Sequence, residues 1–263
     1  MTILDLDDVK TWDKVFDKFI RNDPYWNSIE SALSKDTDDD FNSIIQGLGN
    51  SIEFVESEEI ISLRQRCAIF LKNNYTHVAA YHACRPVSLD SYLINGITPA
   101  NTTILVEEAK LFFNDTNAVE EVVNNMNKEH YGKEYFEHGR DKIGFFKTRN
   151  GSLKDSHYLE YGSELYQCIA RRLGEWAINK MANQGTPTLI RCSLPIAWLD
   201  EYTTFPILHS YALAPVEQII LRIRKPNARF PILGAFMLTR SVPKEFIINT
   251  IDMTLLLKEK ENI

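Results

Sequence analysis

The stretch from Thr76 to Pro99 constrains the fold of this chain more than any other part of the sequence. Its first half, Thr76 to Cys84, is rich in β-branched and small apolar residues, which predicts a short strand that Pro86 then stops. A short helix is expected next, with Ser88 as its N-cap and Gly96 in the left-handed position that ends it. At its end the strand presents an aromatic ring, an imidazole and a guanidinium, those of Tyr81, His82 and Arg85. Such a group at the mouth of a buried strand is typical of a small-molecule site; the competing interpretation is a histidine that only packs in the core.

Length and composition are those of an ordinary globular protein. The chain has 263 residues, of which 44% are hydrophobic and 25% are charged, enough for one large domain or two small ones. No apolar run reaches the ~18 residues of a membrane span, and the acidic N-terminus lacks the basic start of a secretory signal. The four cysteines are far apart, so neither a zinc site nor a disulfide framework is predicted. We therefore expect a cytoplasmic protein without a resident metal or a membrane partner.

Charge is distributed unevenly along the chain. Residues 1–60 hold 15 acidic against 5 basic residues, a balance of −10, whereas residues 61–263 hold 21 acidic and 24 basic residues, a balance of +3. Two interpretations remain open. The acidic front is either a solvated face, or a segment that lies against basic residues of the same chain.

Hydrophobic periodicity predicts helices and strands in a mixed order. Helices are expected over 7–21, 60–71 and 103–126, the last one broken at residues 114–117, and a long one runs from Leu165 to Trp176 behind an N-cap at Ser163. Strands are predicted over 142–149, ending in an Asn150-Gly151 hairpin turn, and over 188–193, 218–224 and 232–238. Residues 34–40, 127–141 and 200–215 are expected to form loops. This order indicates an α+β fold.

Three segments resemble the ADP-ribosyltransferase superfamily. The strand ending in Tyr81-His82, followed by a helix that ends in Gly96-Ile97-Thr98-Pro99, resembles its first motif. Tyr161-Gly162-Ser163-Glu164 looks like a segment of its bacterial toxins, and Val242-Pro243 through Ile247-Ile248 resembles its closing motif. The resemblance implies twisted mixed sheets around an NAD cleft over residues 75–263, with an added helical portion over residues 1–74. It also implies a mono-ADP-ribosyltransferase toxin with NAD as co-substrate.

The resemblance assigns roles to particular residues. It implies that His82 holds the nicotinamide ribose and that Phe145 or Phe146 stacks on nicotinamide while the other turns into the core. Arg85 and Tyr92 complete the NAD-binding candidates. The reaction needs a carboxylate at the ribose, where positive charge develops. By chain order Glu217 fits this role, as the residue that opens a late strand, and Glu160 and Glu164 are its rivals.

The acceptor is left open by the sequence. The resemblance extends to the toxin of a toxin–antitoxin–chaperone phage-defence system, which modifies messenger RNA and would have an antitoxin partner. Basic residues that would bind phosphates if they shared a face are Lys147, Arg149, Lys154, Arg171, Arg172, Arg222, Arg224, Lys225 and Arg229. RNA is therefore slightly favoured. A protein acceptor and an inactive binding module of the same fold are the alternatives.

Overall fold

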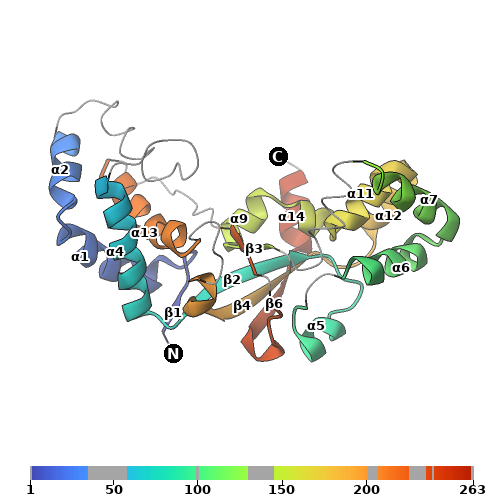
Figure 1. The fold of residues 1–263 in the computed structure, drawn as a ribbon, viewed down its shortest axis with the longest axis horizontal. Coiled ribbons are helices and arrows are strands. Elements are labelled where there is room, and N and C mark those ends of the chain that lie inside the picture. The colour runs from blue at the N-terminus through green and yellow to red at the C-terminus, as the bar shows by residue number, and fades with distance from the viewer. Residues whose placement is uncertain are drawn as a thin grey trace. The chain divides into compact units, whose positions relative to one another are not determined.

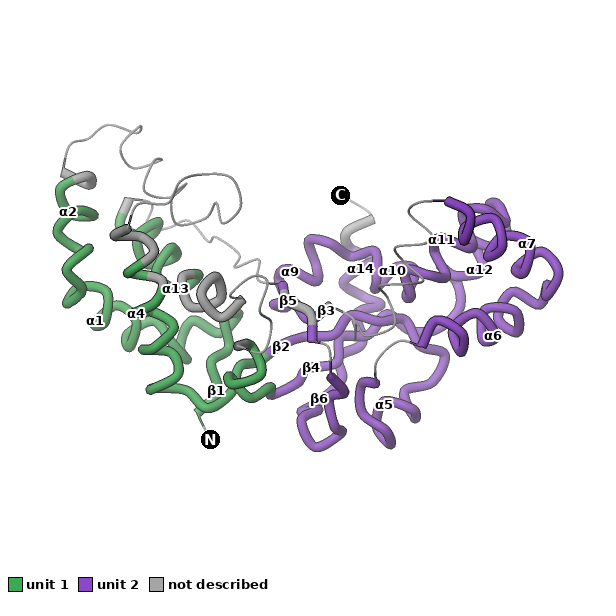
Figure 2. The backbone as a smooth tube through the Cα atoms, in the orientation of Figure 1, with its two compact units in different colours: residues 1–79, 194–234 green, residues 80–193, 235–263 purple. Residues whose placement is uncertain are grey.

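The computed structural model describes residues 2–34, 58–98, 101–129, 145–200, 207–224, 235–238 and 240–261, and the fold mixes helices with a mixed sheet (Figure 1). The chain forms two compact units (Figure 2). Unit 1 consists of residues 1–79 and 194–234, and unit 2 of residues 80–193 and 235–263. The first boundary lies near the expected one, after residue 74. The sequence did not indicate that residues 194–234 would join the N-terminal part.

Unit 1 is built mainly from helices. Its elements are β1 (Ile3–Leu4), η1 (Val9–Thr11), α1 (Asp13–Arg21), α2 (Trp26–Ser34), α4 (Glu58–Asn74), η3 (Ile196–Asp200) and α13 (Ile207–Arg224). The predicted apolar stripes form its core. Phe16 and Ile20 of α1 are fully buried, as are Leu63, Cys67 and Leu71 of α4, which recur every four residues along one helix face. The rings of Phe19 and Phe70 stack at 4.2 Å between centroids, which joins the two helices.

Acidic side chains of the N-terminal stretch bind basic residues within unit 1. The guanidinium of Arg66 on α4 lies 2.6 Å from the carboxylate of Asp23, whose side chain is only 2% exposed. Arg222 of α13 binds Asp13 of α1 and lies 5.4 Å from the ring centre of Trp12. For Asp13 and Asp23, these contacts favour the interpretation that the acidic segment lies against basic residues of the same chain.

Helix α13 corrects two expectations. The predicted strand over 218–224 is wrong, because those residues continue a helix that begins at Ile207 and contains Pro215. Residues 207–215 are therefore helical as well, although a loop was expected there. Val216, Ile219 and Ile220 are buried at helical spacing against α4 and α1. A short apolar run fits a strand and a helix equally well, and packing decided for the helix.

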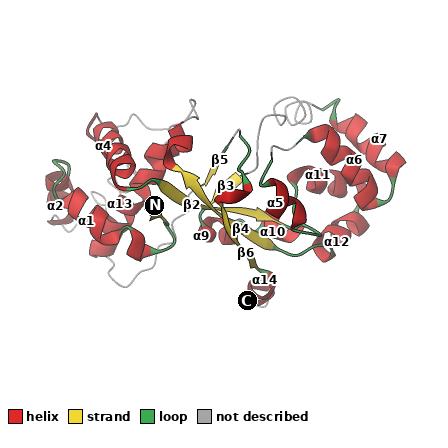
Figure 3. Ribbon diagram, turned by 90° about the horizontal axis from the view of Figure 1, so that it is seen from below, coloured by secondary structure: helices red, strands yellow, loops and turns green. Residues whose placement is uncertain are grey.

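The described strands form one sheet in the order β5-β3-β2-β4-β6, with the short β1 parallel to the start of β2 (Figure 3). The strands of this order are β2 (His77–Cys84), β3 (Phe145–Lys147), β4 (Thr188–Pro195), β5 (Ala235–Met237) and β6 (Ile247–Asp252). The predicted strands over 76–84 and 188–193 are confirmed. Antiparallel pairing of β2 with β3 places His82 opposite Phe146, and Tyr81 opposite Lys147.

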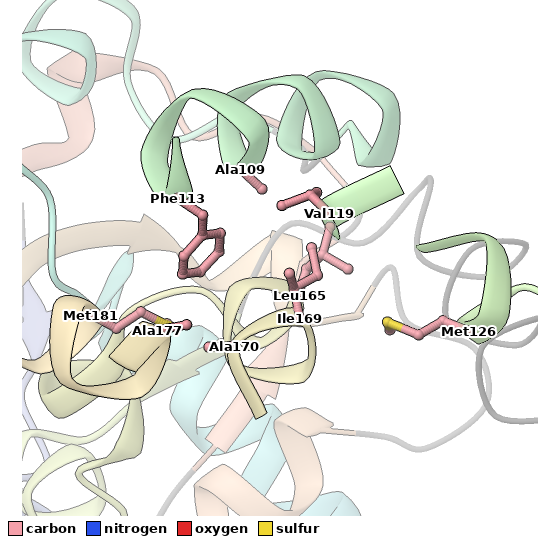
Figure 4. Packing of buried hydrophobic residues seen from close by; sticks show 9 residues of the cluster. All are labelled: Ala109, Phe113, Val119, Met126, Leu165, Ile169, Ala170, Ala177 and Met181. Atoms are coloured by element: carbon pink, nitrogen blue, oxygen red, sulfur yellow. The ribbon is translucent and has the colours of Figure 1, made fainter. Parts of the chain in front are cut away.

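The helices of unit 2 are α5 (Asp90–Asn95), α6 (Thr102–Phe113), α7 (Thr116–Met126), α9 (Arg149–Lys154), α10 (His157–Tyr161), α11 (Glu164–Leu173), α12 (Glu175–Asn183), η4 (Lys244–Phe246) and α14 (Thr254–Glu261). Helices α6, α7, α11 and α12 gather in one group beside the sheet (Figures 1 and 3). Figure 4 shows Ala109 and Phe113 of α6 facing Leu165 and Ile169 of α11 in a shared apolar core. The predicted break between α6 and α7 is confirmed, since Asn114 adopts the left-handed conformation with φ 56°.

Three local expectations in unit 2 are wrong. Asn150-Gly151 makes no hairpin, because Thr148 caps a helix there by accepting a bond from the Gly151 N–H. The long helix after Ser163 is split into α11 and α12 at Gly174, where φ is 108°. The N-cap position of α5 is held by Leu89, although the Ser88 hydroxyl accepts a bond from the Asp90 N–H. The expected loops over 34–40 and 127–141 lie mostly outside the described residues.

Within the part of the chain that is described, no helix has both the length and the hydropathy that crossing a membrane requires.

Candidate functional site

His82 lies in a cluster of rings at the end of β2. Its imidazole is 6.0 Å from the ring of Tyr92 and 5.7 Å from the ring of Phe146, measured between centroids. Phe146 is fully buried, whereas His82 and Tyr92 are each partly exposed. Phe146 is therefore the phenylalanine that turns into the core, and the side chain of Phe145 lies outside the described part. The structure thus brings three of the predicted residues together, and two of them are partly exposed.

The phenol of Tyr92 is fixed by a short chain of hydrogen bonds. Its hydroxyl is bonded to the thiol of Cys84, and Cys84 Sγ donates in turn to the carbonyl oxygen of Thr188 at 3.6 Å. Burial raises the pKa of Tyr92, and the neighbouring thiol and the charge of Glu108 raise it further. Burial also raises the pKa of Cys84 to about 12, so both groups stay protonated at neutral pH. Tyr92 is therefore a neutral, oriented ring beside His82.

The helix that carries Tyr92 is tied to the closing motif through Gly96. This residue ends α5 with φ 77°, and an added Cβ would lie 2.2 Å from the carbonyl oxygen of Val242. The next residue, Ile97, exchanges two backbone hydrogen bonds with Val242, each 2.8 Å long. The Gly-Ile pair and the Val-Pro pair, which are about 145 residues apart in sequence, therefore meet as one unit of structure.

Arg85 is engaged by the backbone rather than by the ring cluster. Its guanidinium donates to the carbonyl oxygens of Leu159, Ala182 and Gln184. Burial lowers its pKa, and the charge of Glu160 opposes that shift. These bonds hold the end of β2 against α10 and the end of α12. Arg85 therefore has a complete structural explanation in this position.

Glu160 and Glu164 lie on the side of the sheet that is opposite to the His82 side chain. Leu159 of α10 packs with Tyr81 and Ala83, and His82, between them in β2, points the other way. Glu160 accepts a hydrogen bond from Ser156, and Glu164 accepts one from the Tyr158 hydroxyl at 3.2 Å. Tyr158 itself packs against the core on the Tyr81 side. The structure therefore does not bring these two glutamates to the ring cluster.

Glu217 lies in the other unit. It is part of α13 in unit 1, partly exposed, and burial raises its pKa. Glu217 was predicted as the catalytic carboxylate because it would open a strand over 218–224. Those residues are helical, so this basis for the prediction is lost. A carboxylate with a raised pKa is nevertheless a common feature of functional sites.

A second polar cluster was missed by sequence reasoning. Asp155 binds both Lys147 Nζ and His157 Nδ1, the His157 and Tyr158 rings are 4.0 Å apart, and Lys147 lies 5.8 Å from the Tyr158 ring centre. The one sequence signal near this cluster is the density of polar aromatic and acidic residues around 157–164, which does not identify Lys147 or Asp155 as its members. Lys147 is buried, so it is not an open phosphate-binding residue.

Other basic residues proposed for RNA are also engaged. Arg172 binds Glu129 at 2.8 Å and Arg222 binds Asp13. Lys225 and Arg229 lie outside the described residues. Among the residues that are described, no three His, Cys, Asp or Glu side chains are grouped as a metal site would need.

Comparisons with protein-family models, with curated proteins and with solved structures gave no match to this chain.

Proposed function

We propose that the chain binds NAD beside His82 and Tyr92, with the buried Phe146 supporting the His82 ring from the core, and transfers ADP-ribose from it to a macromolecule. The observation that supports this most is the position of His82, which is partly exposed at a strand end and 6.0 Å from an oriented tyrosine ring. An imidazole can hydrogen-bond a ribose hydroxyl, and a tyrosine ring offers a π-face to a flat heterocycle. The link from Gly96-Ile97 to Val242 also joins two segments in which the resemblance lies.

The transfer would exchange one bond for another at the ribose. The bond from C1′ to the nicotinamide nitrogen breaks, and nicotinamide leaves as a neutral molecule with the bonding electrons. A new bond forms from C1′ to an oxygen or nitrogen of the acceptor, which loses its proton to a base. The acceptor is RNA, with a protein as the alternative.

The test is incubation of the full chain with isotopically labelled NAD, RNA and protein, followed by mass spectrometry of both fractions. The matched variants are His82→Ala and His77→Ala, two histidines of the same strand. Loss of a ribose hydrogen bond in His82→Ala should weaken NAD binding by about 1 kcal/mol or more, which is roughly five-fold, and His77→Ala should leave it unchanged. If calorimetric titration gives both variants the same affinity for NAD, His82 is not part of the binding site.

A binding module without catalysis is the second candidate, because one observation favours it. Glu160 and Glu164, two of the three candidate glutamates, lie on the face of the sheet opposite to His82. A chain that binds NAD but releases no nicotinamide would be such a module. Release of nicotinamide together with labelled RNA or protein would establish the enzyme.

A further inference from the structure

Cys84 is a buried thiol that lies next to the candidate site. It follows His82 by two residues in β2, so the two side chains project from the same face of the strand. Its side chain is buried, and its sulfur donates to the carbonyl oxygen of Thr188 in β4 at 3.6 Å. A thiol has a single hydrogen, and this bond uses it. Toward any further partner the sulfur can therefore only accept.

The further partner is the hydroxyl of Tyr92 on α5. Because the sulfur accepts, the phenol donates its hydrogen to it. The hydrogen bonds therefore run in one direction, from Tyr92 to Cys84 and on to Thr188, and they join α5 to β2 and β4. The oxygen of Tyr92 thus lies at a buried sulfur, and the part of this partly exposed residue that a ligand can contact is its ring.

The ring of Tyr92 is held at two points. Its hydroxyl is bonded to Cys84, and its backbone carbonyl oxygen accepts from the N–H of Gly96, which ends the helix, at 2.9 Å. The ring centre then lies 6.0 Å from that of His82, with 49° between the ring planes. A side chain that is fixed before a ligand arrives loses less conformational freedom when the ligand binds. Removing the bond to Cys84 would leave the helix end in place and release the ring alone.

We propose that Cys84 is a positioning residue, which holds the ring of Tyr92 beside His82 so that a flat ring of the ligand stacks on it. The inference rests on the proposed function for the identity of the ligand, which is NAD. It adds that Tyr92 contacts the ligand with its ring, whereas its hydroxyl serves only as the anchor to Cys84. The thiol and the hydroxyl then act as one device, so the loss of either has the same effect as the loss of both.

A double-mutant cycle tests this, with NAD affinity measured by titration calorimetry on the full chain carrying Cys84→Ala, Tyr92→Phe or both. Each single change should weaken NAD binding by about three- to ten-fold, which is the contribution of one hydrogen bond, and the double variant should bind no more weakly than either. Cys84→Ser should keep most of the affinity, because its hydroxyl can accept from Tyr92 and donate to Thr188.

Cys192→Ala is the matched control, since it removes another buried thiol from a strand of the same sheet and should leave the affinity unchanged. Additive losses in the double variant would overturn the inference, because they would mean that the Tyr92 hydroxyl acts on the ligand independently of Cys84. A Cys84→Ala variant that binds NAD like the wild type, or a Cys84→Ser variant as weak as Cys84→Ala, would overturn it as well.

Nuclear magnetic resonance of the ligand-free chain separates this inference from the proposed function. The ring current of Tyr92 acts on the imidazole protons of His82, whose signals are assigned by their loss in His82→Ala. Cys84→Ala should shift those signals, and Cys84→Ser should leave them in place. If the wild type binds no NAD, the proposed function fails, and a shift in Cys84→Ala alone still supports the positioning of Tyr92. Unchanged His82 signals in Cys84→Ala would overturn the inference whether or not NAD binds.

Discussion

At the scale of single residues, the Asp155 carboxylate binds both the Lys147 ammonium and the His157 ring. Burial alone would raise its pKa, but hydrogen bonds from Lys147 and His157 outweigh burial and lower it. A lowered pKa means that Asp155 stabilises the fold above its unfolded pKa and that this stability is lost as pH falls through the folded value. Asp155→Asn should therefore lower the free energy of unfolding at pH 7 by up to about 1 kcal/mol, because the carboxylate is more than half exposed. Urea unfolding should show that difference shrinking below pH ~4, and a constant difference from pH 3 to 7 would contradict this role.

The pKa of Glu217 is shifted in the opposite direction to that of Asp155. Burial raises its pKa, so its contribution to stability is present below its unfolded pKa and is lost as pH rises through the folded value. Glu217→Gln removes a half-buried charge and should stabilise the protein at pH 7, by on the order of 1 kcal/mol, but not at pH 3 to 4. Melting curves at both pH values measure this. If the same variant keeps NAD turnover, Glu217 is not the catalytic carboxylate.

At the scale of elements, Gly96 determines where α5 ends. Replacing it adds two separate costs to the free energy of folding, the strain of a positive φ and a clash with the backbone. Gly96→Ala forces a side chain to φ 77° and into a backbone carbonyl 2.2 Å away. Gly174→Ala also meets a positive φ, 108°, but no atom lies within 4 Å of its added Cβ. We expect a loss of about 1–2 kcal/mol for Gly174→Ala and roughly twice that for Gly96→Ala, which should also weaken NAD binding because Tyr92 shifts. Similar losses in both variants, measured by urea unfolding, would contradict the close approach of Gly96 to Val242.

Elements with strong local signals were predicted well from the sequence. The break at Asn114, the strand of His82 and the strand from Thr188 each follow from periodicity and punctuating residues. The strand expected over 218–224 and the hairpin at Asn150-Gly151 failed, because packing against α4 and a cap by Thr148 outweighed local patterns. For the candidate site, the sequence suggested His82, Tyr92 and Phe146 as one group together with Arg85 and Phe145. It could not separate them from Glu160, because only the folded sheet puts His82 and Glu160 on opposite faces.

At the scale of the whole molecule, each of the two units is formed from two separate stretches of the sequence. Unit 1 takes residues 1–79 together with 194–234, so the chain passes between the units after residues 79, 193 and 234. The N-terminal segment therefore shares one compact unit with residues 194–234. This segment supplies the buried Trp12, Phe16 and Ile20, and α13 packs on α1 and α4.

This interleaving predicts the result of an N-terminal truncation. A variant that starts near Ser57 keeps α4 and α13 but loses α1, along with the Asp13 carboxylate and the Trp12 ring that contact Arg222. Removing several fully buried side chains costs about 2–5 kcal/mol for each one, which exceeds what a small unit can lose. Hydrogen exchange measured by mass spectrometry should therefore show α13 losing protection, while α11 and α12 in unit 2 keep theirs. Asp13→Asn in the full chain is the control, because it removes only the ion pair and should leave most of that protection. Unchanged protection of α13 in the truncated variant would show that the acidic front is a solvated appendage after all.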